Sequence, residues 1–274
     1  MSARSYSFTH AIMRAPSNSI THGLRAKDTG TPDIAQFAKD HAHYKNLLES
    51  TGAKVTSLPA LEDYPDSVFV EDAALCLPQG AIIMRPGAPS RLGEATLMKP
   101  VLEQFYKNLP IIEAPVSEAL ATIEGGDILT TEREILVGRS ARTNAVGIEA
   151  LRDIVAPWGY KVREVITPPG VLHFKTDCSL LDENTILATK RLADSGCFAG
   201  YKIIHTAPGE EAAANAIRFN QLVLMPAGFP KTAQILAKAG YDVRQVGNTE
   251  TAKIDGGMSC LSLRFSPPVM QANS

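Results

Sequence analysis

The sequence predicts an α/β fold in which a unit of two strands, a helix and a third strand (ββαβ) is repeated about five times around a ring. Three observations predict it: a recurring phrase of helix, glycine and strand, a pair of strand-like runs between successive phrases, and no linker or low-complexity segment that would divide the chain. We therefore expect a single domain over residues 1–274, with its core at about 9–265 and a disordered tail at 266–274.

The recurring phrase has apolar residues at helical spacing, a residue that ends the helix, and then alternating β-branched residues. It is clearest at 44–58, 151–165 and 233–246, and weaker copies lie at 102–113 and 200–205. The helical runs end at Gly52, Asn108, Gly159, Gly200 and Gly240. The mean spacing of 47 residues between positions 52 and 240 is in the range of structural repeats.

Pairs of strand-like runs fill the stretches between these phrases and are joined by short turns. The pairs are 68–77 with 81–84, 123–129 with 134–137, 178–181 with 185–188, and 216–219 with 222–225. A unit this small cannot bury its own apolar face, so it must pack on its neighbours, and about five copies can close a ring. The alternative is a plain α/β sandwich in which the similarity between units is accidental.

The charge balance argues against nucleic-acid-binding and membrane-surface proteins, which normally carry a basic excess. Lys and Arg number 27 and Asp and Glu number 29, so the net charge is −2. The hydrophobic fraction of 45% excludes a disordered chain. No signal peptide or apolar stretch long enough to span a membrane is visible. We expect a soluble, cytoplasmic protein with neither nucleic acid nor a membrane as its partner.

The cysteines and glycines give no sign of a metal or cofactor. Cys76, Cys178, Cys197 and Cys260 form no C-x-x-C pair, which argues against a metal site, a redox motif or a disulfide framework and favours a reducing compartment. No pair of histidines has zinc spacing, and Gly125-Gly126 lacks the context of a phosphate-binding loop.

Acidic residues lie within apolar segments where buried strands are expected. Asp66, Glu71 and Asp72 mix with apolar residues, and both Ile123–Asp127 and Ile254–Cys260 contain an apolar residue, an acid and two glycines. Equivalent positions of a ring converge near its axis, where carboxylates would repel one another unless they met a cation. This favours a cationic ligand at the hub, with glycines letting its flat head approach the backbone. The alternative is that each acid only forms a turn or caps a helix.

Cys260, His173 and Glu124 fit the general pattern of an activated thiol, in which a nucleophile, a proton carrier and an electrostatic partner come from distant positions. A lone cysteine is more often an inert core residue, and a histidine on a strand is more often simply hydrogen-bonded. Spacing alone leaves these alternatives open.

Seven strings, in order, carry a family resemblance: PDSVFVED, RPGAPSRLGE, IEGGDI, GRSARTN, LH, MPAGFP and IDGGMSC. They resemble the dimethylarginine dimethylaminohydrolases, which are guanidine-modifying enzymes of the pentein, or α/β-propeller, superfamily. The resemblance extends over roughly Thr9 to Phe265. It implies a five-bladed α/β-propeller of ββαβ units, in agreement with the repeat found independently.

The resemblance also implies roles for individual residues. Cys260 resembles the nucleophile that attacks the guanidinium carbon, His173 the general acid and base, and Glu124 the acid that completes the catalytic set. The residues that match substrate contacts are Leu24, Asp66, Phe69, Glu71, Asp72, Arg91, Arg142 and Ile254. Among these, Asp72 and Glu71 match the guanidinium pocket, and Arg91 and Arg142 match the arginines that hold the α-carboxylate. No metal or cofactor is implied, and a homodimer is expected because relatives are often dimers.

The activity that the resemblance implies is hydrolysis of Nω-methylated arginines to citrulline and methylamine or dimethylamine. The nearest alternative is an arginine deiminase or another hydrolase of guanidino compounds, although arginine deiminases usually carry an extra helical insertion. A more distant alternative is a binding propeller that lacks the catalytic set. Residues 23–31 do not match the loop that relatives place over the pocket, which leaves substrate selectivity less well defined than the reaction type.

Overall fold

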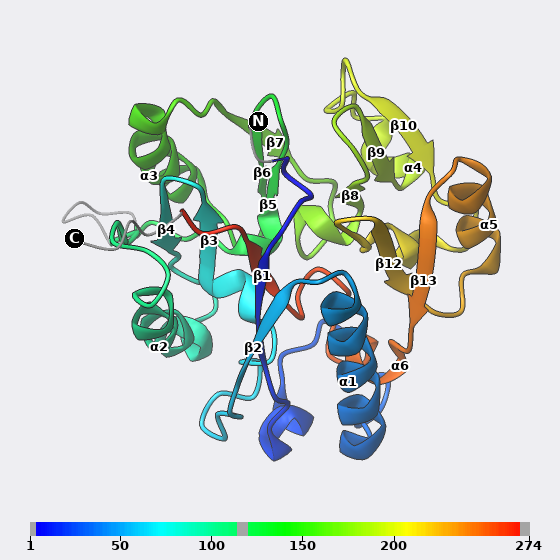
Figure 1. The fold of residues 1–274 in the computed structure, drawn as a ribbon, viewed down its shortest axis with the longest axis horizontal. Helices are drawn as coiled ribbons and strands as arrows, with labels where there is room; N and C mark the ends of the chain where they lie inside the picture. The colour runs from blue at the N-terminus through cyan, green and yellow to red at the C-terminus, as the bar shows by residue number, and fades with distance from the viewer. Residues whose placement is uncertain (1–3, 114–119, 269–274) are drawn as a thin grey trace.

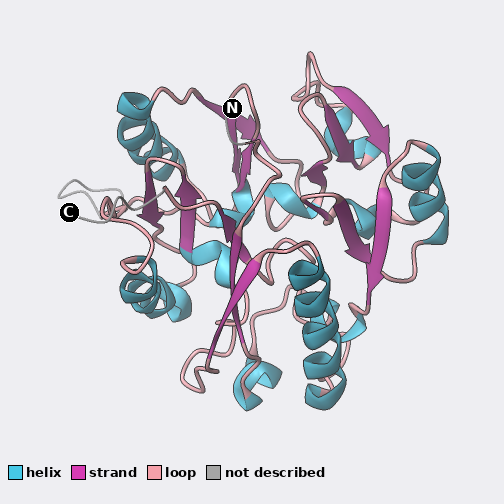
Figure 2. Ribbon diagram, viewed as in Figure 1, coloured by secondary structure: helices cyan, strands magenta, loops and turns pink. Residues whose placement is uncertain are grey.

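Five small sheets surround a central axis in the computed structural model, which describes residues 4–113 and 120–268. The longer helices lie on the outside of this ring (Figure 1), and the sheets radiate from its centre (Figure 2). The predicted five-unit α/β-propeller is confirmed, and the alternative of a plain sandwich is wrong.

Each sheet belongs to one ββαβ unit. The first unit contains β1 (His10–Arg14), α1 (Ile34–Ser50), β2 (Lys54–Leu58) and the last strand, β14 (Leu263–Phe265). The second contains β3 (Ala74–Leu77), β4 (Gly80–Ile83) and α2 (Leu92–Leu102). The third contains β5 (Ile128–Thr130), β6 (Ile135–Arg139), α3 (Ala145–Val155) and β7 (Val162–Ile166). The fourth contains β8 (Cys178–Leu180), β9 (Thr185–Ala188), α4 (Lys190–Ala193) and β10 (Lys202–His205). The fifth contains β11 (Ile217–Phe219), β12 (Leu222–Pro226), α5 (Pro230–Lys238) and β13 (Asp242–Val246), followed by α6 (Thr249–Ala252).

Within a unit the first two strands pair antiparallel, and the strand after the helix pairs parallel to the second. This order follows from the connections, since a tight turn joins antiparallel strands whereas a parallel strand needs a helical crossover. In the first unit β14 takes the place of the first strand, with Arg264 opposite Ala11. The two ends of the chain therefore share one sheet, and their pairing closes the ring.

Helix ends agree with the predicted stops at Gly52, Gly159 and Gly240, whose φ values lie between 88° and 94°, in the left-handed region that glycine adopts most easily. The predictions for Asn108 and Gly200 are wrong, because α2 already ends at Leu102 and α4 at Ala193. The Asn108 carbonyl instead accepts a hydrogen bond from the Ala81 N–H at 3.1 Å, and a single bridge between Ile83 and Ile111 stands where the other units have their third strand.

Two predicted strands start later than expected. Residues 70–73 and 125–127 form 3₁₀ helices, and only the residues after them enter β3 and β5. The carboxylates of these turns join each turn to the next segment: the Gly126 N–H donates to Asp72 at 2.8 Å, and the Phe174 N–H donates to Asp127 at 2.8 Å. These bonds replace the partners that a strand would give to the backbone. Further 3₁₀ helices are Asn18–His22, Pro89–Arg91, Ala156–Trp158, Phe174–Thr176 and Glu211–Ala214.

The hydrophobic core consists of five clusters, each formed by two adjacent units. Tyr44 and Leu48 of α1, for example, pack with Phe219 of β11 and Leu224 of β12. Tyr44 also donates a hydrogen bond to the Met258 carbonyl at 2.9 Å, which ties α1 to the segment that carries Cys260. Because each unit buries its apolar side chains against its neighbours, the ring is needed for every unit to be stable.

The sequence predicts a disordered tail at 266–274. Beyond β14, Ser266 accepts a hydrogen bond from the Thr9 N–H at 3.1 Å, so the predicted tail is attached at its start. From residue 269 onward that prediction lies outside the described residues. Within the part of the chain that the structure covers, no helix has both the length and the apolarity needed to cross a lipid bilayer.

Candidate active site

A small cavity at the hub collects most of the predicted site residues. It is lined by Leu24, Asp66, Phe69, Asp72, Arg91, Arg142, Leu172, His173, Ile254, Asp255, Gly256 and Cys260. These side chains come from the 3₁₀ helices and loops that precede the strands of several units, so the ring brings together residues more than 200 positions apart. Glu124 does not line the cavity, but its carboxylate contacts the His173 ring.

Cys260 lies in the loop between α6 and β14 and is 8% exposed. Burial raises the pKa of its thiol to about 11, and the negative charges of Asp72 and Glu71 act in the same direction. At neutral pH the unliganded protein therefore holds Cys260 as a thiol. A thiolate would require additional positive charge in the cavity.

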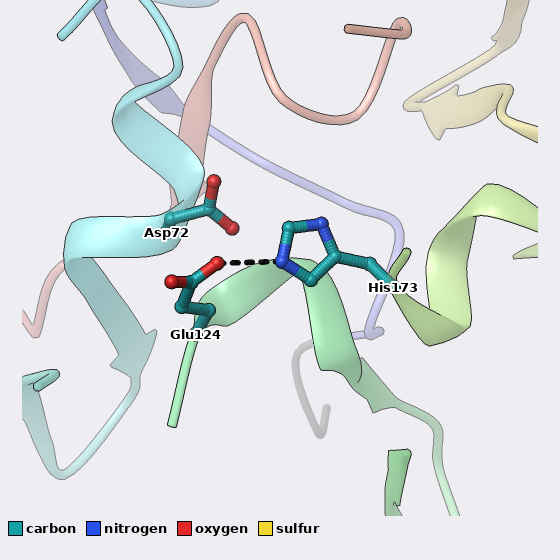
Figure 3. A group of neighbouring side chains, drawn as sticks. All are labelled: Asp72, Glu124 and His173. Carbon is teal, nitrogen blue, oxygen red and sulfur yellow. Dashed lines mark hydrogen bonds and ion pairs between the residues drawn. The ribbon is translucent and has the colours of Figure 1, made fainter. Parts of the chain in front are cut away.

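His173 and Glu124 form a buried hydrogen bond of 2.6 Å between Nε2 and a carboxylate oxygen (Figure 3). Burial disfavours the charged imidazole, but the charges of Asp72 and Asp127 and the bond to Glu124 outweigh it and raise the pKa of His173 to about 9. Burial likewise opposes ionisation of Glu124, yet the hydrogen bond from His173 keeps the pKa of that carboxyl below its usual value. The pair is thus an imidazolium and a carboxylate at neutral pH.

Asp72 points toward the same pair from the next segment (Figure 3). Its two oxygens accept hydrogen bonds from Arg91 at 2.6 Å and from the Gly126 N–H at 2.8 Å. Burial opposes the charged form, but Arg91 and His173 more than compensate and lower the pKa of Asp72 to about 2. Asp72 is therefore a permanently charged carboxylate beside the imidazolium of His173.

The two arginines predicted to bind the α-carboxylate differ in their exposure and in the number of hydrogen bonds that they already make. Arg91 is 4% exposed and donates to Asp72, to both oxygens of Glu94 and to the Phe69 carbonyl, at 2.6 to 3.2 Å. Arg142 donates only one longer bond of 3.2 Å to Glu124, with a second contact at 3.5 Å, and its side chain is 18% exposed. The geometry favours Arg142 as the group that could bind an anion, and it gives Arg91 the role of holding Asp72.

The prediction that Glu71 lines the substrate pocket disagrees with the structure. Its carboxylate pairs with Lys175 at 2.5 Å and with Arg264, and it lines a separate cavity on the other side of the catalytic segments. Successive residues here face opposite sides, so Asp72 enters the site while Glu71 does not. The string of acids in the sequence could not distinguish the two.

Several residues around the cavity were missed by the sequence-based site prediction. Leu172, Asp255 and Gly256 line it, and Glu94 pairs with Arg91 behind it. Asp255 has a φ of 58° and accepts a hydrogen bond from the Ala26 N–H at 2.5 Å, while Asp66 accepts one from Leu24 at 2.9 Å. These two bonds tether the exposed loop at 24–26 to the cavity. The repeated acid and glycine pattern could have identified Asp255.

Two glycines of the site allow neighbouring side chains to approach the backbone closely. A Cβ atom at Gly126 would lie 2.9 Å from the His173 ring and from Asp72, and one at Gly256 would lie 2.5 Å from the Phe69 ring. Both glycines therefore let site side chains pack directly on the backbone. Their predicted role, close approach of a flat ligand to the backbone, stays a prediction.

Replacing Gly126 with alanine is expected to reduce kcat/KM by about 100-fold, because the new methyl group displaces His173 and Asp72 from each other. Gly209→Ala is a control for a general loss of stability: a Cβ there meets nothing within 4 Å and the residue lies outside the cavity, but its φ of 80° makes the alanine strained, so the melting temperatures of both variants are compared as well. The check is the release of citrulline, the product that the family resemblance implies, measured for both variants. Equal activity of the two variants would contradict it.

The pKa of Cys260 gives a second expected result. In Asp72→Asn a negative charge that raises the thiol pKa is removed, so the pH midpoint of Cys260 alkylation by iodoacetamide should fall below about 11. The exposed Asp242→Asn serves as the control and should leave the midpoint unchanged. Peptide mapping identifies the alkylated residue at each pH. A midpoint that rises or does not move in Asp72→Asn would contradict the electrostatic account.

Asp72, Glu124 and His173 offer ligand atoms within 4.8 Å of one another, so a metal ion has to be considered. The His173 nitrogen and the Glu124 oxygen are only 2.6 Å apart, whereas a tetrahedral zinc ion would hold such ligands about 3.3 Å apart. Both carboxylates also have guanidinium partners, Arg91 and Arg142. The group is better suited to holding and transferring a proton than to binding a metal.

Known proteins resemble the chain over nearly its full length. A sequence model of the arginine deiminase family matches residues 56–221. The N(G),N(G)-dimethylarginine dimethylaminohydrolase of Pseudomonas aeruginosa is 40% identical over 94% of this chain and 100% of that protein. The protein of the same name from Streptomyces coelicolor is 31% identical over 93% of this chain and 96% of its own length. A solved structure of the Pseudomonas aeruginosa enzyme, a cysteine-to-serine mutant complexed with citrulline, has a TM-score of 0.90 at 39% identity and covers 95% of this chain and 100% of that one. The chain therefore belongs to the dimethylarginine dimethylaminohydrolase family.

Proposed function

We propose that this protein hydrolyses Nω-methylated arginines, namely asymmetric dimethylarginine and monomethylarginine, to citrulline and dimethylamine or methylamine. The observation that carries the proposal is the cavity in which Cys260 and His173 face a buried carboxylate, Asp72, with Glu124 hydrogen-bonded to His173. Two relatives reported above are named N(G),N(G)-dimethylarginine dimethylaminohydrolase, and a solved structure of one of them is complexed with citrulline.

The charges of the cavity suit a cationic substrate head. Asp66, Asp72 and Asp255 line it and Glu124 lies next to it, against the cations Arg91, Arg142 and His173. Glu94 pairs with Arg91, but burial raises the pKa of its carboxyl to about 7, so it adds only part of a negative charge at neutral pH. The excess of carboxylates attracts a guanidinium group, and charge-assisted hydrogen bonds to Asp72 would orient its plane. The bound cation supplies the positive charge that the Cys260 thiol needs in order to ionise.

The reaction then follows from the order of protonation states. When the cation binds, the Cys260 thiol releases its proton to solvent, because His173 is already protonated. The thiolate then attacks the guanidinium carbon and forms a C–S bond. The tetrahedral intermediate collapses when His173, an imidazolium near neutral pH, protonates the methylated nitrogen, which leaves as an amine. The remaining thiouronium is attacked by water, one proton of which passes to His173. The C–S bond then breaks, the remaining hydroxyl proton passes to the departing sulfur, and citrulline and the Cys260 thiol are formed. Glu124 holds the imidazole and stabilises its charged form throughout.

The other end of the substrate would be bound near the cavity mouth. Arg142 binds the α-carboxylate, because its guanidinium is partly exposed and only weakly engaged with Glu124. Asp66 and the backbone of Leu24, tethered to each other, and the backbone of Ile254 would contact the amino group and the segment beside the nucleophile. Phe69, packed on Gly256, forms an apolar wall of the cavity.

A second candidate is hydrolysis of unmethylated arginine, favoured by the match to the arginine deiminase family model. Methylation removes hydrogen-bond donors but leaves the charge, so a pocket tuned to arginine would lose bonds on binding the dimethyl form. We expect methylated arginines to be favoured over arginine in kcat/KM by at least about tenfold, or roughly 1.4 kcal/mol of transition-state binding. Citrulline release from arginine, monomethylarginine and asymmetric dimethylarginine decides between them, and arginine as the best substrate would overturn our proposal.

Arg142→Ala should weaken the binding of all three substrates alike, since they share the α-carboxylate.

A cytoplasmic location and a homodimer also belong to this proposal. The first is supported by the four free cysteines, which suit a reducing compartment. Gel filtration with light scattering tests the second.

A further inference from the structure

The segment that carries Cys260 has no regular secondary structure. Residues 258–261 form turns between α6 and β14, so neither a helix nor a strand ladder fixes the backbone on the two sides of the sulfur. The position of the segment therefore depends on hydrogen bonds from elsewhere in the fold. Tyr44 donates to the Met258 carbonyl at 2.9 Å, and the Ser259 N–H donates to the Asn215 side chain at 2.9 Å.

Arg264 binds the backbone on both sides of Cys260. Its Nη1 lies within hydrogen-bond distance of the Ser259 carbonyl at 2.8 Å, the Ser262 carbonyl at 2.7 Å and the Ser262 hydroxyl at 3.0 Å. The residue itself lies in β14, whose pairing with β1 closes the ring, so the base of the side chain is fixed. The guanidinium is a rigid planar donor, and the side chain is largely buried. This one group thus ties the turns around the nucleophile to the sheet.

The nearby carboxylate does not by itself explain a buried arginine here. Arg264 and Lys175 both donate to one oxygen of Glu71, and all three side chains are largely buried. Two cations therefore meet one carboxylate, which Lys175 alone would neutralise. Taking a second cation out of water costs free energy, so the bonds of Arg264 to residues 259 and 262 have to offset that cost.

We propose that Arg264 is a positioning residue for the nucleophile: it holds residues 259–262 in the conformation that places the Cys260 sulfur in the catalytic cavity. The inference rests on the proposed function, which gives Cys260 the attack on the substrate. Arg264 does not line that cavity, so it acts through the backbone rather than on the substrate. The substrate-binding residues Arg142 and Asp66 lie on other segments, so substrate binding should depend little on Arg264.

Arg264→Lys tests the proposal, because lysine keeps the charge beside Glu71 but loses the planar group that binds both carbonyls. We expect kcat for citrulline release from asymmetric dimethylarginine to fall by about 10- to 100-fold, an effect typical of reacting groups that are misplaced by about 1 Å. KM should stay within about threefold of wild type, because the substrate contacts are intact. An unchanged kcat would overturn the proposal.

Arg163→Lys is the matched control for this substitution. Arg163 donates to both oxygens of Glu134 at 2.8 Å and to the Cys197 carbonyl at 2.9 Å, so it also joins a carboxylate to the backbone, but outside the catalytic cavity. This variant should leave kcat unchanged. Its side chain is more exposed than that of Arg264, so the melting temperatures of both variants are compared as well.

Alkylation by iodoacetamide, followed by peptide mapping, separates positioning from a general loss of stability. Cys260 is 8% exposed and Cys178 is fully buried, so local loosening of residues 259–262 exposes only Cys260, whereas unfolding exposes both. Because lysine keeps the positive charge, the ionisation of the Cys260 thiol should not change. In Arg264→Lys we expect Cys260 to react at least about threefold faster, relative to Cys178, than in wild type. A ratio of the two rates that is unchanged or lower would overturn the proposal.

The experiment decides in two other cases as well. If Arg264→Lys does not fold, Ser262→Ala carries the test, since it removes one of the three acceptors of Arg264 and should raise the same ratio by a smaller factor. An unchanged ratio in that variant would overturn the proposal. If the wild-type protein releases no citrulline, the proposed function fails, and the ratio of alkylation rates alone decides whether Arg264 positions Cys260.

Discussion

Replacing Cys260 with serine is expected to lower citrulline formation by at least about 10⁴-fold while the fold is retained. The guanidinium carbon is a poor electrophile because its charge is delocalised, so the attacking group has to be a thiolate. A serine hydroxyl cannot ionise in this site, where burial and Asp72 already raise the pKa of the more acidic thiol to about 11. Steady-state citrulline release and the melting temperature measure the two parts of the expectation.

The other three cysteines provide matched controls. Cys178 is buried between the third and fourth units, and Cys76 and Cys197 pack against neighbouring clusters, away from the cavity. Conservative substitutions such as Cys76→Ala should leave kcat/KM within about threefold of wild type. Substantial residual turnover in Cys260→Ser would mean that another group is the nucleophile.

Replacing His173 with glutamine is expected to reduce kcat by about 10² to 10⁴-fold, the usual contribution of a general acid and base. Glutamine keeps a polar partner for the fully buried Glu124, so the loss reports proton transfer rather than an uncompensated charge. Both amine departure and thiouronium hydrolysis should slow. Citrulline release measures the rate, and the mass of the intact protein under turnover reports whether an adduct accumulates.

His205→Gln is the control for this variant, because His205 lies in the outer strand β10, far from the cavity lining. The pH profile adds a second criterion. The pKa of His173 is raised, so its protonated form, which is the acid in amine departure, is lost as the pH rises through about 9. Activity of the wild-type protein should therefore fall above that pH. Near-normal rates in His173→Gln would show that another group transfers the proton.

The repeat was visible in the sequence because each unit carries the same physical requirements. A helix commonly ends with a residue in the left-handed backbone conformation, and Gly52, Gly159 and Gly240 adopt it at regular spacing. A closed ring was predicted, but the pair of strands that closes it was not. Strands β1 and β14 pair across more than 250 residues, and neither contains a pattern that names its partner. In the second unit the sequence predicted a helix that ends at Asn108 and a strand after it. The structure has a helix that ends at Leu102 and only a single bridge between Ile83 and Ile111.

The candidate site was only partly predictable. Acids within apolar segments indicated a charged hub, and the family motifs named Cys260, His173 and Glu124. Sequence could not tell that Glu71 and Asp72 face opposite sides of the same layer, since this depends on the turn at Val70–Ala73. Nor could it reveal that Glu94 engages Arg91, because the pairing at a spacing of three residues matters only once burial removes water from both groups.

The most direct test of covalent catalysis by Cys260 is the mass of the protein trapped during turnover. Rapid acid quenching of the wild-type protein with asymmetric dimethylarginine or with monomethylarginine, followed by peptide mapping, locates the adduct and measures its mass. If the methylated nitrogen leaves, as proposed, both substrates give the same thiouronium mass on the peptide that contains Cys260. An adduct on Cys76, Cys178 or Cys197, or one that retains the methyl groups, would contradict the account.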